Sequence, residues 1–156
     1  MDRMTLLAQI AEELKEAETN GLPIPQLSSV YLLNIDDAYQ IQLLNMEKAL
    51  DEGRRITGKK IGLTSKAMQE SLKVNQPDFG FLYESMEVKG DRIPYGAILQ
   101  PRVEGELAFV LKEDLSGEPG IDEVLAATDY VVPAIEIVGS RIQNWNLTIV
   151  DTIADN

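Results

Sequence analysis

Residues 102–110 read RVEGELAFV, and the alternation within this stretch decides how the second half of the chain folds. Alternate side chains of a β-strand point to opposite faces, so Glu104 and Glu106 share one face while Leu107 and Phe109 share the other. Two residues of strand span about 6.6 Å, which lets both carboxylates converge on one ion. The same spacing fits a solvated outer face equally well, and these residues alone leave both interpretations open.

A second stretch, YVVPAIEIVG at 130–139, is apolar on both strand faces except at Glu136. A continuous apolar run predicts a strand that is covered on both sides. A carboxylate buried there needs a compensating partner, because an unpaired one is costly or takes up a proton. That partner is an arginine or lysine in an ordinary ion pair, with Arg102 and Arg141 as candidates, or a metal ion that Glu136 holds together with the two glutamates of the first stretch.

The composition narrows the chemistry that the chain can perform. It has 14 Lys and Arg against 26 Asp and Glu, for a formal net charge of −12, which disfavours nucleic acid and anionic membrane surfaces as partners. It has no cysteine and no histidine, which excludes disulfides, thiolate nucleophiles and the usual ligands of zinc, copper and nickel. Acid–base work therefore falls to Asp, Glu, Lys or Tyr, and a metal must accept oxygen ligands, as Mg²⁺, Mn²⁺ and Ca²⁺ do. No apolar run approaches the roughly 20 residues of a membrane span, so we expect a cytoplasmic protein.

The spacing of apolar residues predicts helices first and mainly strands afterwards. One helix carries apolar residues from Leu6 to Ala17 and ends at Asn20-Gly21, and a second begins at Asp36 and ends near Gly53. The other expected elements are, in chain order, a strand at 55–64, a short helix at 65–72, a turn at 75–80, strands at 81–88 and 103–111, a short helix at 121–127 and a strand at 130–138. This order predicts an α+β fold in a single domain, 1–156, with a helical part at 1–54 and a strand-rich part at 55–156.

The stretch GKKIGLTS at 58–65 places glycines on both sides of Lys60. Gly58 and Gly62 let the backbone pass close to another segment or to a ligand. On the residues alone, a surface lysine is the simpler interpretation of Lys60, and Asp78 in QPDFG fits a turn former.

Four blocks of the chain closely resemble the 2-keto-4-pentenoate (2-hydroxypenta-2,4-dienoate) hydratases of the fumarylacetoacetate hydrolase superfamily. They are GKKIGLTSKAMQESLKVNQPDFGFL at 58–82, QPRVEGELAFVLKEDL at 100–115, VLAATDYVVPAIEIVGSRIQNW at 124–145 and DTIADN at 151–156. The resemblance implies N-terminal helices followed by a mixed β-roll, of which 55–156 is the first part of the catalytic core. It implies a Mg²⁺ or Mn²⁺ ion held by Glu104, Glu106 and Glu136. It also implies that Lys60 and Asp78 take part in proton transfer and substrate binding.

The activity that the resemblance implies is a metal-dependent lyase of aromatic-compound catabolism. Such a hydratase adds water to 2-hydroxypenta-2,4-dienoate and gives 4-hydroxy-2-oxopentanoate. Its partner is a small 2-hydroxy-dienoate or 2-oxo acid, and we expect a homo-oligomer. Two alternatives stay open: a 4-oxalocrotonate (2-oxo-3-hexenedioate) decarboxylase of the same superfamily, and a truncated, non-catalytic module for metal binding or oligomerisation.

The chain departs from the family pattern in two places. The family block usually reads EIVDSRI, whereas this chain has Gly139 in place of that aspartate, so Arg141 is expected to lack a partner. The chain also stops at DTIADN where family members continue. We therefore expect a roll that is truncated at its C-terminal side, with sheet edges left open.

Overall fold

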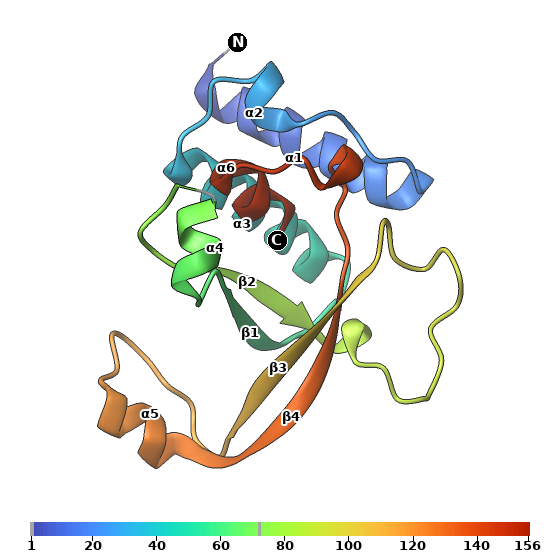
Figure 1. Ribbon diagram of the computed structural model, residues 1–156. Coiled ribbons are helices and arrows are strands. Elements are labelled where there is room, and N and C mark those ends of the chain that lie inside the picture. The colour runs from blue at the N-terminus through green and yellow to red at the C-terminus, as the bar shows by residue number, and fades with distance from the viewer. Residues whose placement is uncertain (1, 72) are drawn as a thin grey trace. The chain divides into compact units, whose positions relative to one another are not determined.

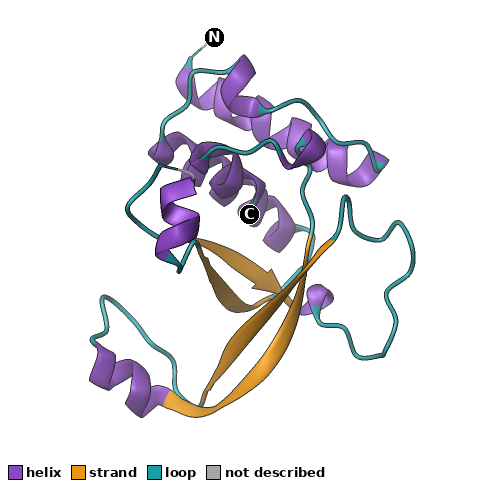
Figure 2. Ribbon diagram, in the orientation of Figure 1, coloured by secondary structure: helices purple, strands orange, loops and turns teal. Residues whose placement is uncertain are grey.

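The computed structural model describes residues 2–71 and 73–156, which form helices and antiparallel strands in two compact units. One unit comprises Met1–Gln100 together with Ser140–Asn156, and the other comprises Pro101–Gly139. Figures 1 and 2 show that the first unit carries most of the helices with one strand pair, and that the second is a long strand pair with one short helix. The α+β class predicted from the sequence is confirmed.

Three helices build the core of the first unit: α1 (Arg3–Asn20), α3 (Ile35–Asp51) and α6 (Ile149–Asp155). Helix α1 buries the predicted apolar face, and it ends where Gly21 adopts a left-handed φ of 68°. Asn34 caps α3 in a reciprocal capping box with Asp37, so this helix begins one residue before the predicted start. The apolar side chains that these helices bury are Leu7, Ile10, Ala11, Leu14, Ala38, Ile41, Val150, Ile153 and Ala154.

Helix α6 and the one-turn helix α2 (Leu27–Val30) were not predicted from the sequence. The completely buried Asp151 joins them, because its carboxylate accepts hydrogen bonds from the backbone and hydroxyl of Ser28 and from Thr148 at the start of α6. These hydrogen bonds outweigh burial and hold the pKa of Asp151 below its ordinary value. These hydrogen bonds thereby join helix α6 to α2.

The first unit also contains an antiparallel strand pair, β1 (Ile56–Gly62) and β2 (Asp78–Tyr83), with helix α4 (Lys66–Ser71) between them. Strand β1 and helix α4 match the predictions, except that Leu72, the expected end of the helix, lies outside the described residues. The expected turn at 75–80 is wrong for its last three residues, because Asp78–Gly80 already pairs with β1. The predicted strand at 81–88 is wrong beyond Tyr83, where β2 ends and a 3-10 helix at Glu84–Met86 follows.

The second unit pairs β3 (Arg102–Leu111) with β4 (Thr128–Val138) in antiparallel order, and α5 (Ile121–Ala127) precedes β4. All three elements fall where the sequence predicts them. The expectation that β4 is covered on both faces is wrong, since Ile135 is 74% exposed and Glu136 is only half-buried. Within the part of the chain that the structure describes, β4 pairs in its sheet with β3 alone, so the other edge of β4 carries no further strand. Among the described residues, no helix is long and apolar enough to cross a membrane.

Candidate functional site

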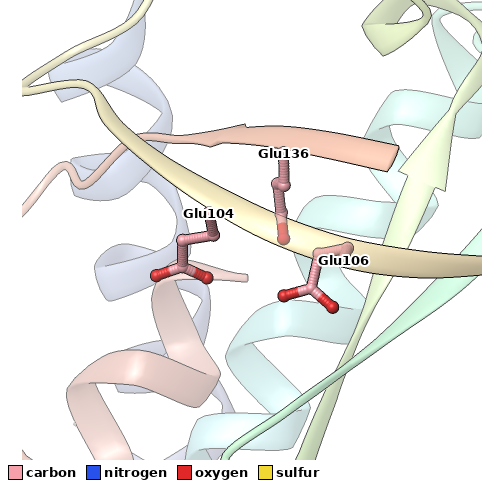
Figure 3. Close-up of side chains that lie close together, drawn as sticks. All are labelled: Glu104, Glu106 and Glu136. Carbon is pink, nitrogen blue, oxygen red and sulfur yellow. The ribbon is translucent and has the colours of Figure 1, made fainter. Parts of the chain in front are cut away.

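Three glutamates of the second unit lie on one face of the β3–β4 pair. The register places Glu104 directly opposite Glu136, and Glu106 opposite Ala134. Partners in an antiparallel ladder share a face, and so do residues two apart on one strand, so the register alone puts all three side chains together. Figure 3 shows the three carboxylates on the same side of the two strands. One carboxylate oxygen from each residue lies within 4.8 Å of the others.

This arrangement is electrostatically unfavourable unless a positive charge is present, because like charges directly opposite each other destabilise a strand pair. Oxygen ligands of Mg²⁺ or Ca²⁺ lie roughly 2.0 to 2.6 Å from the ion. Three oxygens within 4.8 Å of one another can therefore surround one hard dication. Glu104 and Glu106 are exposed and Glu136 is half-buried, so an ion and its remaining ligands have access to the cluster.

Arginine is the other source of positive charge considered for Glu136. Arg102 pairs with Val138 in the register and so lies on the same face as the three glutamates, two residues from Glu104. Arg141 makes its ion pairs in the first unit. Its Nε donates to Asp155 Oδ1 at 2.6 Å, and its Nη1 lies 3.7 Å from Glu18 Oε2. The expectation that Arg141 lacks a partner is therefore wrong, because Asp155 supplies the carboxylate that Gly139 does not.

Lys60 and Asp78 lie diagonally across the β1–β2 pair, in the first unit. Gly62 is opposite Asp78 and Gly80 is opposite Lys60, so both charged residues share a face and each has a glycine as its cross-strand partner. A Cβ on Gly62 would lie 2.3 Å from Asp78 Oδ1, and one on Gly80 would lie 3.0 Å from Lys60 Cε. The two glycines thus provide the space that the two charged side chains occupy.

The carboxyl group of Asp78 is nearly buried, with 7% of the residue exposed. Burial raises the pKa of Asp78 above its ordinary value, while a hydrogen bond from its own backbone and the charge of Lys60 act in the opposite direction. A carboxyl group with a raised pKa holds its proton closer to neutral pH, which suits acid–base chemistry.

Helix α3 supplies a further polar group near Asp78, Tyr39, whose proximity was not predicted from the sequence. Burial raises the pKa of Tyr39, and the charge of Asp78 raises it further. The ring of Tyr39 stacks on Phe79, with centroids 4.5 Å apart. Tyr39 occurs at helical spacing among apolar residues, and nothing in that pattern distinguishes it from a core aromatic. Its position beside Asp78 becomes visible only in the folded chain.

Comparison with known proteins places the chain among hydratases. It is 48% identical over 151 residues to the 2-keto-4-pentenoate hydratase of Paraburkholderia xenovorans (strain LB400), and this match covers 95% of the chain and 56% of the relative. It is 46% identical over 161 residues to a 2-hydroxypent-2,4-dienoate hydratase of Pseudomonas putida, covering 100% of the chain and 72% of the relative. No protein-family model matches the chain.

Solved structures of a related enzyme resemble the chain over its whole length. The 4-oxalocrotonate decarboxylase of Pseudomonas putida G7, complexed with magnesium and adipate, matches with a TM-score of 0.91 and 31% identity. That match covers 100% of the chain and 60% of the decarboxylase, and a complex of the same enzyme with calcium and acetate matches with a TM-score of 0.88. The chain spans 56% of the length of the first hydratase named above, and 72% of the P. putida hydratase. From these identities and their coverage, the chain belongs to the 2-keto-4-pentenoate hydratase family.

Proposed function

We propose that the protein carrying this chain adds water to 2-hydroxypenta-2,4-dienoate to give 4-hydroxy-2-oxopentanoate, as a hydro-lyase in the breakdown of aromatic compounds. The support is the identity of 46 to 48% with relatives that bear hydratase names. The reaction first protonates the far end of the dienol, which gives a conjugated 2-oxo acid, and water then adds at C4. Both steps need a group that gives or takes a proton and a means of stabilising charge on the 2-oxygen.

We propose that Glu104, Glu106 and Glu136 hold a divalent cation, Mg²⁺ or Mn²⁺. The observation that carries this proposal is the placement of their carboxylate oxygens within 4.8 Å of one another on one face of β3–β4. The structural neighbours, which are complexes with magnesium and with calcium, add support. A divalent ion supplies a Lewis acid that stabilises negative charge on a keto-acid oxygen.

We assign proton transfer and substrate contact to Lys60 and Asp78. Asp78 fits an acid–base role because burial raises its pKa. Lys60 shares its face and carries a positive charge that suits either a proton donor or a contact to the substrate carboxylate. Tyr39 lies close enough to respond to the charge of Asp78, while its ring stacks on Phe79.

We propose that the strand pairs belong to a β-roll and that the protein assembles as a homo-oligomer. A roll buries the apolar face of its strands, and the face of β3–β4 opposite the glutamates is apolar and open. Its most exposed members are Val103, Leu107, Phe109 and Ile135. The TM-score of 0.91 with the decarboxylase over the whole chain supports the same architecture.

The deciding experiment follows loss of dienol absorbance with purified protein and Mg²⁺, and identifies the product. Formation of 4-hydroxy-2-oxopentanoate that is abolished by Lys60→Met, but not by Lys59→Met, supports the assignment, because exposed Lys59 pairs with Phe81 and points away from Asp78. Release of CO₂ from 2-oxo-3-hexenedioate, without hydration of the dienoate, would instead establish the decarboxylase that the structural neighbours favour. Stabilisation by Mg²⁺ without any turnover would identify a non-catalytic metal-binding module.

A further inference from the structure

In the described part of the chain, side-chain amides and not a further strand close the edge of β2 that faces away from β1. Gln42 Nε2 donates to the carbonyl of Phe79 at 3.0 Å, and it also donates to the carbonyl of Ile153 at 2.9 Å. Asn156 accepts from the backbone N–H of Phe81 at 2.8 Å and donates to its carbonyl at 3.2 Å. An open edge otherwise leaves such groups to water or to another chain. These two amides fix β2 to helices α3 and α6.

Asn156 differs from Gln42 because it also lies against Gly80. A Cβ on Gly80 would come within 2.6 Å of Asn156 Oδ1 and within 3.0 Å of Lys60 Cε. The amide of Asn156 and the stem of Lys60 therefore pack against the same point of β2, where only a glycine leaves room for both. The stem of a lysine is flexible, so neighbours that confine it decide where its ammonium group lies.

We propose that Asn156 is a positioning residue for Lys60: its side-chain amide binds the backbone of Phe81 and confines the Lys60 stem over Gly80. This inference rests on the proposed function, which makes Lys60 and Asp78 the groups that handle the proton. Asn156 itself does not need to touch the substrate. Its effect passes through the position of the Lys60 ammonium group relative to the carboxyl group of Asp78.

The test uses the chain as it stands, labelled for NMR, and needs no turnover. Asn156→Ala is expected to speed hydrogen exchange of the Phe81 amide about tenfold or more, because this N–H loses its acceptor. It is also expected to raise the pKa of Asp78 further, because the Lys60 charge that lowers it moves away. Burial is the largest influence on the pKa of Asp78 and raises it, the Asp78 backbone and the Lys60 charge lower it, and Tyr39 is the titratable neighbour from α3.

A double-mutant cycle shows whether the effect passes through Lys60. In a Lys60→Met background, Asn156→Ala should leave the Asp78 titration unchanged while still exposing the Phe81 amide. Gly80→Ala perturbs the same contact independently and should move the Asp78 titration in the same direction. Thr152→Ala changes a half-buried residue of the same helix whose hydroxyl donates to the Thr148 carbonyl, and it should alter neither readout.

The proposal is overturned if Asn156→Ala exposes the Phe81 amide but leaves the Asp78 titration of the wild-type background unmoved, since Asn156 would then only close the strand edge. It is also overturned if the shift persists in full after Lys60→Met. A different result would show that the proposed function, and not the positioning role of Asn156, is wrong. In that case Lys60→Met leaves turnover intact, while the exchange and titration measurements still report whether Asn156 positions Lys60.

Discussion

Glu104 and Glu136 lie directly opposite each other across the β3–β4 ladder, on the same face as Glu106. The E-x-E pattern brings two carboxylates to one face of a strand, but only the antiparallel register adds the third. A one-residue shift of β4 in the register would turn Glu136 to the opposite face and separate it from the other two glutamates. The cation proposal therefore depends on register as much as on residue type.

Replacement of Glu104 by Gln should change stability in opposite directions with and without a divalent ion. Without metal, Glu104→Gln removes repulsion from Glu136 and should stabilise the chain by about 0.2 to 1 kcal/mol. With Mg²⁺ or Mn²⁺ in excess, the wild type should gain stability by ligand linkage, and the variant should gain little. Thermal melts at matched ionic strength, with and without the ion, measure both effects.

If an arginine and not a metal ion compensates the three glutamates, the Glu104→Gln variant should behave differently. If Arg102 compensates the cluster, Glu104→Gln should destabilise the chain without metal, and Mg²⁺ should leave both melts unchanged. Titration with Mn²⁺ followed by EPR then adds a direct measurement, because binding broadens and depletes the signal of the free ion. Absence of binding by the wild type in this titration would remove the metal proposal.

A side chain added at position 62 should reduce stability and turnover far more than one added at position 58. A Cβ on Gly62 would lie 2.3 Å from Asp78 Oδ1, whereas one on Gly58 would meet Leu82 at 3.6 Å, an ordinary contact. Gly62→Ala should displace the Asp78 carboxyl, cost about 1 to 3 kcal/mol and reduce turnover. Gly58→Ala is the matched control on the same strand. Equal effects of the two substitutions on urea unfolding and activity would contradict the role given to Gly62.

Much of the secondary structure could be predicted, because it depends on short-range patterns. The 3.6-residue spacing of apolar side chains and the helix-ending residues Asn20-Gly21 predict α1. The alternation of side chains between two faces predicts β3. Burial of β4 could not be predicted the same way, since an apolar run reports what a strand can bury and not what covers it. Helix α6 was missed because it is short and gains its stability from buried Asp151, a long-range contact.

The residues of the candidate site also differ in whether a short-range pattern or a long-range contact identifies them. The three glutamates were singled out by residue type and strand spacing, and Lys60 and Asp78 through resemblance to a family. Tyr39, Gln42 and Asn156 were not found, because their positions depend on how α3 and α6 pack against β2. No local pattern distinguishes an asparagine that closes a strand edge from one that ends a helix.

Stability should respond to pH through Asp78 in a defined direction. Its pKa in the folded chain is raised above the ordinary 3.8, so the folded state binds the proton more tightly than the unfolded state. The stability associated with this group is therefore complete below 3.8 and is lost as pH rises through the higher folded value. Asp78→Asn should remove that loss, so the variant should become more stable relative to wild type as pH rises above about 4.

Urea unfolding at several pH values measures this difference. In Lys60→Met the loss should be larger, because the charge that opposes the raised pKa is gone. A stability difference between Asp78→Asn and wild type that stays constant with pH would mean that Asp78 titrates alike in the folded and unfolded chain.

The ion pair between Arg141 and Asp155 should be a major contributor to the stability of the helical unit. Asp155 accepts from the Ser140 hydroxyl at 2.7 Å, the Arg141 backbone N–H at 3.0 Å and the Arg141 Nε at 2.6 Å, with 9% of its side chain exposed. Asp155→Ala leaves all three donors without this acceptor and should cost about 3 kcal/mol or more. Arg141→Met should cost less, because Asp155 keeps its two other donors.

Glu18 provides the control for the expected order of stability losses. Its Oε2 lies 3.7 Å from Arg141 Nη1, and 57% of its side chain is exposed. Glu18→Gln should cost less than about 1 kcal/mol, as is usual for exposed pairs. Urea denaturation of the three variants should therefore rank the losses as Asp155→Ala, then Arg141→Met, then Glu18→Gln. A loss for Glu18→Gln as large as that for Asp155→Ala would mean that Arg141 depends on the exposed partner, and that Asp155 does not replace the aspartate missing at Gly139.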